Sequence, residues 1–283
     1  MGSRTLTRST RRWRPPSRRP RFSRTREAVV YLKSEEELAL MRQAGRIVAQ
    51  VLAAVRERVA PGVTTGELDA LAEEIIRDHG AIPSFKGYPN ISPEGPPFPA
   101  TICASVNDEL VHGIPGPRVL QEGDIISVDV GAIYQGFHGD AAITIPVGEI
   151  SEEARRLLEV TEQALYVGIA QARLGNRTGD IAWAIQQYVE SHGFSVVREY
   201  TSHGIGREMH EGFQMLNVGR PGRGLRLRPG MTIALEPMVN AGTWKTRLLS
   251  DQWTVATADG RLSAHFEHTI AITNGEAEIL TRL

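Results

Sequence analysis

The chain has 283 residues, 41% of them hydrophobic, and a formal net charge of −1 at pH 7. This length suits one large domain or two fused halves, and no apolar run approaches the roughly 18 residues that cross a bilayer. The single cysteine, Cys103, excludes an intrachain disulfide and suits a reducing compartment. We therefore expect a globular, cytoplasmic protein that does not associate with membranes.

The amino-terminal segment has a charge unlike that of the rest. Residues 1–26 hold ten arginines and no acidic residue, which leaves 22 basic against 33 acidic residues in the remainder. Because the segment lacks apolar periodicity and contains three prolines, we expect residues 1–28 to be a disordered basic extension. Three interpretations stay open: an organelle transit peptide, a basic arm that touches RNA at the ribosome, or an artefact of start-site choice, with the natural chain beginning at Val29 or Val30.

Helical and strand patterns alternate from residue 29 onward. Four helices are predicted, each opened by a hydroxyl side chain and closed by glycine or proline. Their caps are Ser34, Thr64 or Thr65, Ser151 and Thr178, and their ends lie at Pro61, Gly80, about Arg173 and Gly193. Strands are predicted near residues 100–106, 125–133, 137–147, 195–201, 231–236, 252–257 and 265–272. Hairpin signals predominate, so the pattern predicts an α/β fold with mainly antiparallel strands.

An internal repeat relates two parts of the chain. A set of five residues recurs 113 positions later, where Gly62, Thr65, Gly66, His79 and Gly80 become Gly175, Thr178, Gly179, His192 and Gly193. The run 123–129 also matches 230–236, at an offset of 107, and each run ends in a carboxylate. For the first of these two echoes, as we call the matches, the alternative explanation is a chance match among glycine-rich helix ends. We interpret both echoes as two pseudo-symmetric halves, at about 29–150 and 151–283, whose strand carboxylates meet at the axis.

Five acidic or imidazole residues close or interrupt strand-like runs: Asp129, Asp140, His203, Glu236 and Glu267. A carboxylate in a buried strand is costly unless something pairs with it, so these residues call for cations. If a hairpin turns at Tyr134-Gln135, Asp129 faces Asp140 with Cβ atoms about 4.5–5.5 Å apart. Two like charges so close destabilise the fold, share a proton or bridge cations. The glycines of this hairpin leave the register open to a bulge.

Several runs of the sequence resemble one enzyme family. VNDELVHGIP, ISVDVGAIYQGFHGDAAITI, SHGIGREMHE, MTIALEPM, DQWTVATADG and SAHFEHTIAI are similar to type I methionine aminopeptidases, and the likeness covers residues 30–283. The resemblance implies the pita-bread fold, in which two halves enclose a dinuclear metal centre. It also implies a catalytic domain over residues 29–283 that removes the initiator methionine from nascent proteins when the second residue is small. The reaction would be attack of a metal-activated water on the first peptide bond.

The resemblance also implies a ligand set for the two ions. Asp129 would chelate one ion, Asp140 and Glu267 would bridge both, and His203 with Glu236 would complete the second. Oxygen ligands with one imidazole suit divalent Co, Mn, Fe or Zn.

Further roles follow from the same resemblance. Glu236 would shuttle a proton, His210 would polarise the scissile carbonyl and hold the oxyanion, and His112 would contact the scissile amide nitrogen. The methionine side chain would bind in an apolar pocket lined by Phe85, Tyr88, Cys103, Met209 and Trp253. We expect His79, His138, His192 and His265 to be ordinary surface or packing residues, and His268 to point to the face of its strand opposite Glu267.

Three features depart from the family pattern. Met209 replaces a common aromatic residue, Ser202 replaces a frequent glycine, and residues 90–101 add a proline-rich loop that we expect at the rim of the pocket. Prolidases and proline-specific aminopeptidases share the fold and ligands but usually carry a large amino-terminal domain. A binding protein of this fold without catalysis would have lost ligands. We expect a monomer that acts on nascent polypeptide amino termini, touches the ribosome at most transiently and binds no DNA.

Overall fold

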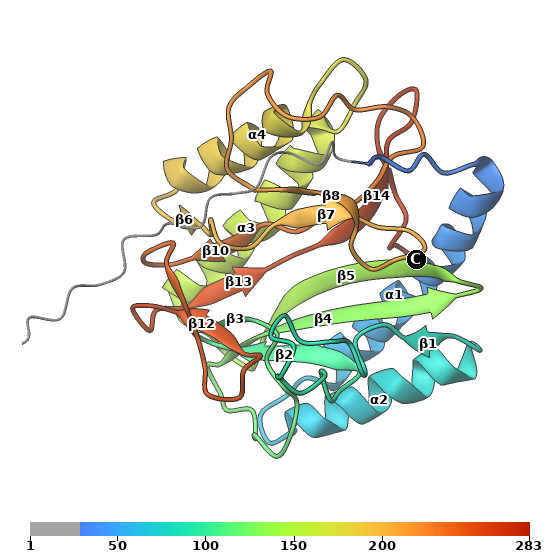
Figure 1. The fold of residues 1–283 in the computed structure, drawn as a ribbon. Helices are drawn as coiled ribbons and strands as arrows, with labels where there is room; N and C mark the ends of the chain where they lie inside the picture. The colour runs from blue at the N-terminus through green and yellow to red at the C-terminus, as the bar shows by residue number, and fades with distance from the viewer. Residues whose placement is uncertain (1–28) are drawn as a thin grey trace, which may run out of the picture.

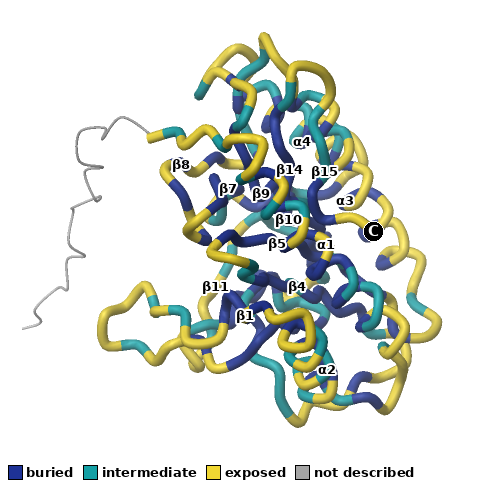
Figure 2. Tube along the Cα trace, turned by 90° about the vertical axis from the view of Figure 1, so that its right-hand side faces the viewer, coloured by how far each residue is buried: buried dark blue, intermediate teal, exposed yellow. Residues whose placement is uncertain are grey.

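Residues 29–283 are described in the structure, which is a computed structural model, so the predictions on residues 1–28 lie outside the described residues. The described residues form four helices: α1 (Glu35–Arg58), α2 (Thr65–Asp78), α3 (Glu152–Gln171) and α4 (Thr178–Ser191). Strands cross the middle of the molecule (Figure 1), and the helices lie on one side of them, at the right in Figure 2. The opposite side is therefore free of helices.

Every strand pairing is antiparallel, as predicted. One sheet joins β1 (Ile82–Pro83), β4 (Ile125–Tyr134) and β2 (Ile102–Val106), with β5 (Phe137–Pro146) also paired to β4. A second has the order β15 (Glu278–Ile279), β14 (His268–Ala271), β9 (Thr232–Leu235), β7 (Ser202–Gly204) and β8 (Glu211–Met215). Two smaller sheets are β13 (Ser263–His265), β10 (Met238–Asn240) and β6 (Ser195–Val196), and β11 (Thr246–Leu248), β12 (Val255–Thr257) and β3 (Glu109–Val111).

Local hydrogen bonds explain where the helices begin. At α1 the Ser34 hydroxyl accepts from the Glu37 N–H at 3.3 Å and the Glu37 carboxylate accepts from the Ser34 N–H at 3.0 Å, which confirms the predicted capping box. The prediction that Thr178 caps α4 is wrong by one residue, because the cap is Arg177. Its N–H donates to the Asp180 carboxylate at 2.7 Å, while the Thr178 hydroxyl accepts from the loop that follows β8.

The sequence repeat has a structural counterpart. Helices α2 and α4 have 14 residues each and begin 113 positions apart, and strands β4 and β9 begin 107 apart. Isolated bridges precede both helices at equivalent places, Thr64 with Val119 and Arg177 with Arg226. The match of paired elements and their bridges makes chance an inadequate explanation for the echoes. The boundary between the two halves, near residue 150, stays a prediction.

The predicted register of the β4–β5 hairpin is wrong by two residues. Asp129 pairs with Ala142, and Asp140 pairs with Gly131. The turn lies at Gln135-Gly136, where both residues have positive φ, 47° and 82°, because a two-residue turn of this kind matches the twist of the strands. A shift of two residues keeps both aspartates on the same face of the hairpin, so they remain diagonal neighbours.

Helix α1 packs closely on the hairpin. By length and composition it could span a bilayer, but its apolar residues Met41, Val48 and Val51 are fully buried against the protein, as in the core helix of a globular domain. The backbones come very close at one point, since a Cβ atom on Gly139 would lie 2.7 Å from the Gly45 nitrogen. Glycine at position 139 lets α1 approach the strand immediately before Asp140, while a Cβ atom on Gly45 would meet the Leu280 carbonyl instead. The contact fixes that aspartate against the helix.

The segment before α1 is tied to the second sheet. The Lys33 ammonium forms an ion pair with the Glu211 carboxylate, and both side chains are nearly inaccessible. The Lys33 N–H donates to the Gly230 carbonyl at 2.8 Å, and the Glu211 carboxylate also accepts from the Arg207 N–H at 2.6 Å. These bonds hold residues 29–34 beside the loop that carries His210.

Candidate active site

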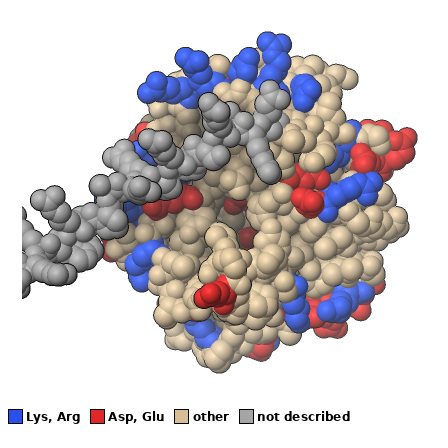
Figure 3. Space-filling view, viewed as in Figure 1, with Lys and Arg blue, Asp and Glu red and all other residues tan. Residues whose placement is uncertain are grey.

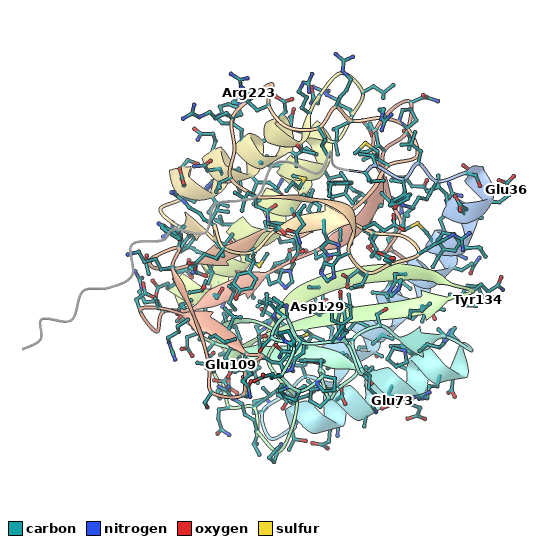
Figure 4. All side chains as sticks on the ribbon, in the orientation of Figure 1. Glu36, Glu73, Glu109, Asp129, Tyr134 and Arg223 are labelled. Carbon is teal, nitrogen blue, oxygen red and sulfur yellow. The ribbon has the colours of Figure 1, made fainter. Side chains whose placement is uncertain are left out.

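The molecule contains a cavity of about 540 Å³. Figure 3 shows a hollow on one face with acidic side chains in its depth, and Figure 4 places Asp129 at the centre of the molecule. All twelve predicted site residues line the cavity: Phe85, Tyr88, Cys103, His112, Asp129, Asp140, His203, Met209, His210, Glu236, Trp253 and Glu267. The structure thus brings every predicted site residue to one cavity.

The five predicted ligands come from several strands. Asp129 lies in β4, Asp140 in β5 and His203 in β7, while Glu236 follows β9 and Glu267 precedes β14. Ligand atoms of Asp140, His203 and Glu267 lie within 4.8 Å of one another. The Nε2 atom of His203 is 3.9 Å from Asp140 Oδ2 and 3.5 Å from Glu236 Oε1. A cluster of this size matches the ligand shell of small cations.

Burial disfavours the charged form of these four carboxylates unless a cation is bound. Loss of hydration, the largest effect, raises the pKa of Asp129 to about 6 and raises the pKa values of Asp140, Glu236 and Glu267 well above their usual range. Among the described residues, no lysine or arginine forms an ion pair with them. One oxygen each of Asp129, Asp140 and Glu267 is buried without a hydrogen-bond partner. Two divalent ions would satisfy these oxygens and balance four carboxylates.

The tautomer of His203 supports the same conclusion. Its Nδ1 lies 2.9 Å from the Gly204 carbonyl oxygen, which can only accept, so Nδ1 carries the proton. Burial lowers the His203 pKa to about 3, so the ring is neutral and Nε2 holds a lone pair. That lone pair faces the oxygens of Asp140 and Glu236. A cation between them turns this repulsion into coordination. The residues present therefore fit a divalent metal centre.

The two predicted catalytic histidines, His112 and His210, both line the cavity. The His210 ring lies over His203, with centroids 4.2 Å apart, and its Nδ1 is 2.7 Å from the Tyr88 hydroxyl oxygen. Desolvation lowers the His210 pKa and lowers the His112 pKa to about 4. His112 has a φ of 60°, an uncommon backbone conformation for a residue with a side chain, and its ring contacts Trp253 edge to face. Both rings are neutral at pH 7.

The cavity lining contains more residues than the five predicted for the methionine pocket. Phe98 and Met238 also line it, as do Tyr200 and Thr201. Phe98 packs on Trp253 with ring centroids 5.2 Å apart. Sequence reasoning missed Phe98 because it lies within the proline-rich loop, where no strand or helix pattern fixes the direction of a side chain.

The proline-rich loop lies at the rim, as predicted. The Trp253 indole N–H donates to the Pro96 carbonyl at 2.9 Å, and the Asn90 amide donates to the Gln252 carbonyl at 3.1 Å. These bonds join residues 90–98 to the loop before β12. Ile91, which is 95% exposed, borders the cavity from this rim. An extended peptide that leaves the cavity in this direction would meet the loop.

Three further residues lie beside predicted ligands: Ser202, His265 and His268. The Ser202 hydroxyl accepts from the Glu236 N–H at 3.0 Å and donates to the side-chain amide oxygen of Asn217 at 2.8 Å, so this departure from glycine holds the backbone of a predicted ligand in place. His268 points away from Glu267, as predicted, and its Nδ1 lies 2.9 Å from the Thr281 hydroxyl. The prediction that His265 is an ordinary packing residue overlooked its place, 3.4 Å from Glu236.

The remaining histidines behave as predicted. His79 and His192 are exposed and occupy the C-caps of α2 and α4, where each Nδ1 contacts a carbonyl of the last turn. His138 is buried and its Nδ1 lies 2.9 Å from the Ser84 hydroxyl, a packing role.

Comparison with known proteins places this geometry in a family. Residues 39–274 match metallopeptidase family M24. The chain is 53% identical over 255 residues to methionine aminopeptidase 1 of Bacillus subtilis, covering 90% of this chain and all of that protein. It is 52% identical over 253 residues to the methionine aminopeptidase of Clostridium perfringens, with 89% and 99% covered.

Solved structures agree with the sequence matches. The methionine aminopeptidase from Thermotoga maritima has a TM-score of 0.87 at 46% identity and is covered completely, together with 90% of this chain. The prolidase from Pyrococcus horikoshii has a TM-score of 0.69 at 21% identity, and the match covers 89% of this chain but 63% of the prolidase, so that likeness concerns the fold alone. The predicted pita-bread fold is confirmed. The chain belongs to metallopeptidase family M24 and, within it, to the methionine aminopeptidases.

Proposed function

We propose that the protein removes the amino-terminal methionine from nascent polypeptides whose second residue is small. One observation carries the proposal: the carboxylate and imidazole cluster shares its cavity with a cluster of apolar side chains. A methionine side chain packed on these apolar residues would hold the first peptide bond of a substrate beside the carboxylates. The family supports the same reaction, since the most similar relatives reported above are methionine aminopeptidases.

Divalent metal ions are the cofactors of this reaction. The residues that would hold them are Asp129, Asp140, His203, Glu236 and Glu267, whose unpartnered oxygens and lone pair fit cations. When bound, the ions supply Lewis-acid charge and lower the pKa of a water molecule so that it can act as nucleophile at neutral pH. The chain supplies the binding and proton-transfer groups around this chemistry.

Three side chains would act on the substrate. Glu236 would carry the proton from the attacking water to the leaving amine, since burial raises its affinity for a proton. A neutral His210 would donate from Nε2 to the carbonyl oxygen as negative charge develops there, while Tyr88 fixes the ring through Nδ1. His112, also in the cavity lining, would contact the scissile amide nitrogen.

The pocket supports a preference for methionine. Phe85, Cys103 and Met209 are buried and soft or aromatic, and burial raises the Cys103 pKa well above its usual range, so its thiol stays neutral. Tyr88 and Trp253 complete the lining. An unbranched thioether fits such an irregular apolar space.

A peptide assay tests the proposal. With Mn²⁺ or Co²⁺ present, the purified protein is expected to release methionine from Met-Gly-Met-Met and to cleave Leu-Gly-Met-Met at least about 10²-fold more slowly, because a branched side chain packs poorly in the pocket. Addition of a chelator should abolish turnover, and metal should restore it. Equal cleavage of both peptides, or faster cleavage of an Xaa-Pro peptide, would reject methionine excision in favour of another family activity.

We further infer cytoplasmic action close to the ribosome. Four arginines are exposed in the loop between β8 and β9, and Arg223 lies at the upper margin in Figure 4, far from Asp129: Arg220, Arg223, Arg226 and Arg228. Blue side chains gather along the same margin in Figure 3. In a chain whose described body is otherwise acidic, such a patch favours contact with a polyanion such as ribosomal RNA.

Replacement of these four arginines by glutamate tests the contact. Co-sedimentation with ribosomes is expected to fall, and that of the parent protein should weaken steeply as salt increases. Turnover of a free tetrapeptide should not change, because none of the four arginines lines the cavity. Ribosome binding that is equal in both proteins at all salt concentrations would exclude this patch as the contact, and size-exclusion chromatography of the same samples tests the proposed monomer.

A further inference from the structure

His265 is the most anomalous buried side chain outside the predicted site. It ends strand β13 and is 1% exposed, yet neither ring nitrogen has a hydrogen-bond partner in the described part of the chain. Its Nε2 lies 3.4 Å from Glu236 Oε2 and 3.9 Å from Glu267 Oε2. A buried polar group without partners is costly, so its presence calls for an explanation.

The backbone of His265 is held firmly in place. Its N–H donates to the Thr144 hydroxyl oxygen at 2.9 Å, and the same hydroxyl donates to the His265 carbonyl at 2.9 Å. On the other edge, His265 pairs with Met238 of β10. These contacts join β13 to β5, the strand of Asp140. The ring therefore has little freedom to reach partners other than the two glutamates.

Its position relative to the cavity separates His265 from the predicted ligands. Those five residues line the cavity, whereas His265 does not. Ligand atoms of His265, Glu236 and Glu267 lie within 4.8 Å of one another, so distance alone would also allow a shared ion. Because the ring does not border the cavity that would hold the ions, its placement favours contact with the two carboxylates themselves.

We propose that His265 is a positioning residue that orients Glu236 for metal binding and proton transfer. This inference rests on the proposed function of the site. A neutral imidazole has one N–H, and carboxylate oxygens can only accept, so the tautomer with the proton on Nε2 is favoured beside Glu236. A shift of a few tenths of an ångström brings Nε2 and Oε2 within ordinary hydrogen-bond distance. One carboxylate oxygen then faces His265 while the other faces the cavity.

Metal titration of substituted proteins tests the role without reference to turnover. His265→Leu should weaken Mn²⁺ binding to the metal-free protein by about 10–100-fold in calorimetry, as expected for the loss of a group that orients a ligand. His265→Gln keeps an N–H donor and should bind within a few fold of the parent. The matched control is His268→Leu, which removes a half-buried histidine next to Glu267 in the chain and should bind metal like the parent.

Stability and spectra distinguish the alternatives. Metal-free His265→Leu should melt at the parent temperature or higher, because an apolar side chain replaces an unpartnered polar one. If it fails to fold, His265→Met, which adapts more readily to its surroundings, takes its place. Unchanged Mn²⁺ affinity in the folded variant would overturn the proposal. A changed Co²⁺ absorption spectrum in His265→Gln would also overturn it, by showing that the imidazole itself is a ligand. If the parent binds metal but releases no methionine, the proposed function fails while the affinity test of His265 remains valid.

Discussion

His203→Ala is expected to lose metal and activity together, with kcat/KM at least about 10³-fold below that of the parent. The Nε2 lone pair of His203 faces Asp140 and Glu236, and no other imidazole lining the cavity is directed at those two oxygens. Its removal leaves buried carboxylates that take up protons in place of a cation, since burial already raises their pKa values. Metal charge contributes several kcal/mol to stabilising the transition state, and each 1.4 kcal/mol is a factor of about ten in rate.

Metal analysis and kinetics on the same sample check this result. The matched control is His192→Ala, which removes the exposed C-cap histidine of α4 and should keep the metal content and rate of the parent. Asp129→Asn and Glu267→Gln should behave like His203→Ala. A His203→Ala protein that retains a full complement of metal and normal turnover would show that the cluster is not the catalytic centre.

His210→Ala is expected to keep its metal and still lose about 10²–10³-fold in kcat, the usual cost of removing a donor to a developing oxyanion. The ring contacts His203 and the Tyr88 hydroxyl but lies too far out to complete the ligand cluster. Because the donor acts mainly when charge develops on the carbonyl oxygen, kcat should fall much more than KM rises.

His210→Gln gives a graded comparison, because its amide can donate to the same region without the ring. Its kcat should lie between those of the parent and the alanine variant. Equal metal content in all three proteins is the essential control. A loss of metal in His210→Ala would place this residue among the ligands, and unchanged kcat would remove it from the mechanism.

The sequence located the site better than it located the geometry within it. Each predicted ligand stands in a run that carries the family resemblance, so Asp129 and Glu267 could be proposed as ligands without knowledge of their distance. Spacing alone put Asp129 opposite Asp140, and it failed because a turn at Gln135-Gly136 needs positive φ at both positions. The residue type identifies a candidate ligand. The strand register, in contrast, depends on backbone angles that the amino-acid sequence specifies poorly.

Short strands and some packing partners were also not predicted from the sequence. Strands β10, β13 and β15 have two or three residues each, too few for an alternating pattern to stand out. The cap of α4 was displaced to Arg177 because Thr178 bonds to a segment 47 positions away. The position of His265 was overlooked for a similar reason, because its neighbour Glu236 is distant in the chain. The run SAHFEHTIAI does not indicate that both ring nitrogens of this histidine will be buried without hydrogen-bond partners.

The buried ion pair of Lys33 has a practical consequence for how the enzyme is prepared. By tying residues 29–34 to the second sheet, it holds Val29 and Tyr31 at a depression that also contains His210 and Gln214, two residues of the catalytic cavity. A purification tag joined before Val29 is thus tethered beside His210, where we expect it to compete with peptides for space. Leu283, 77% exposed, borders neither hollow, so we expect a carboxyl-terminal tag to leave both hollows clear.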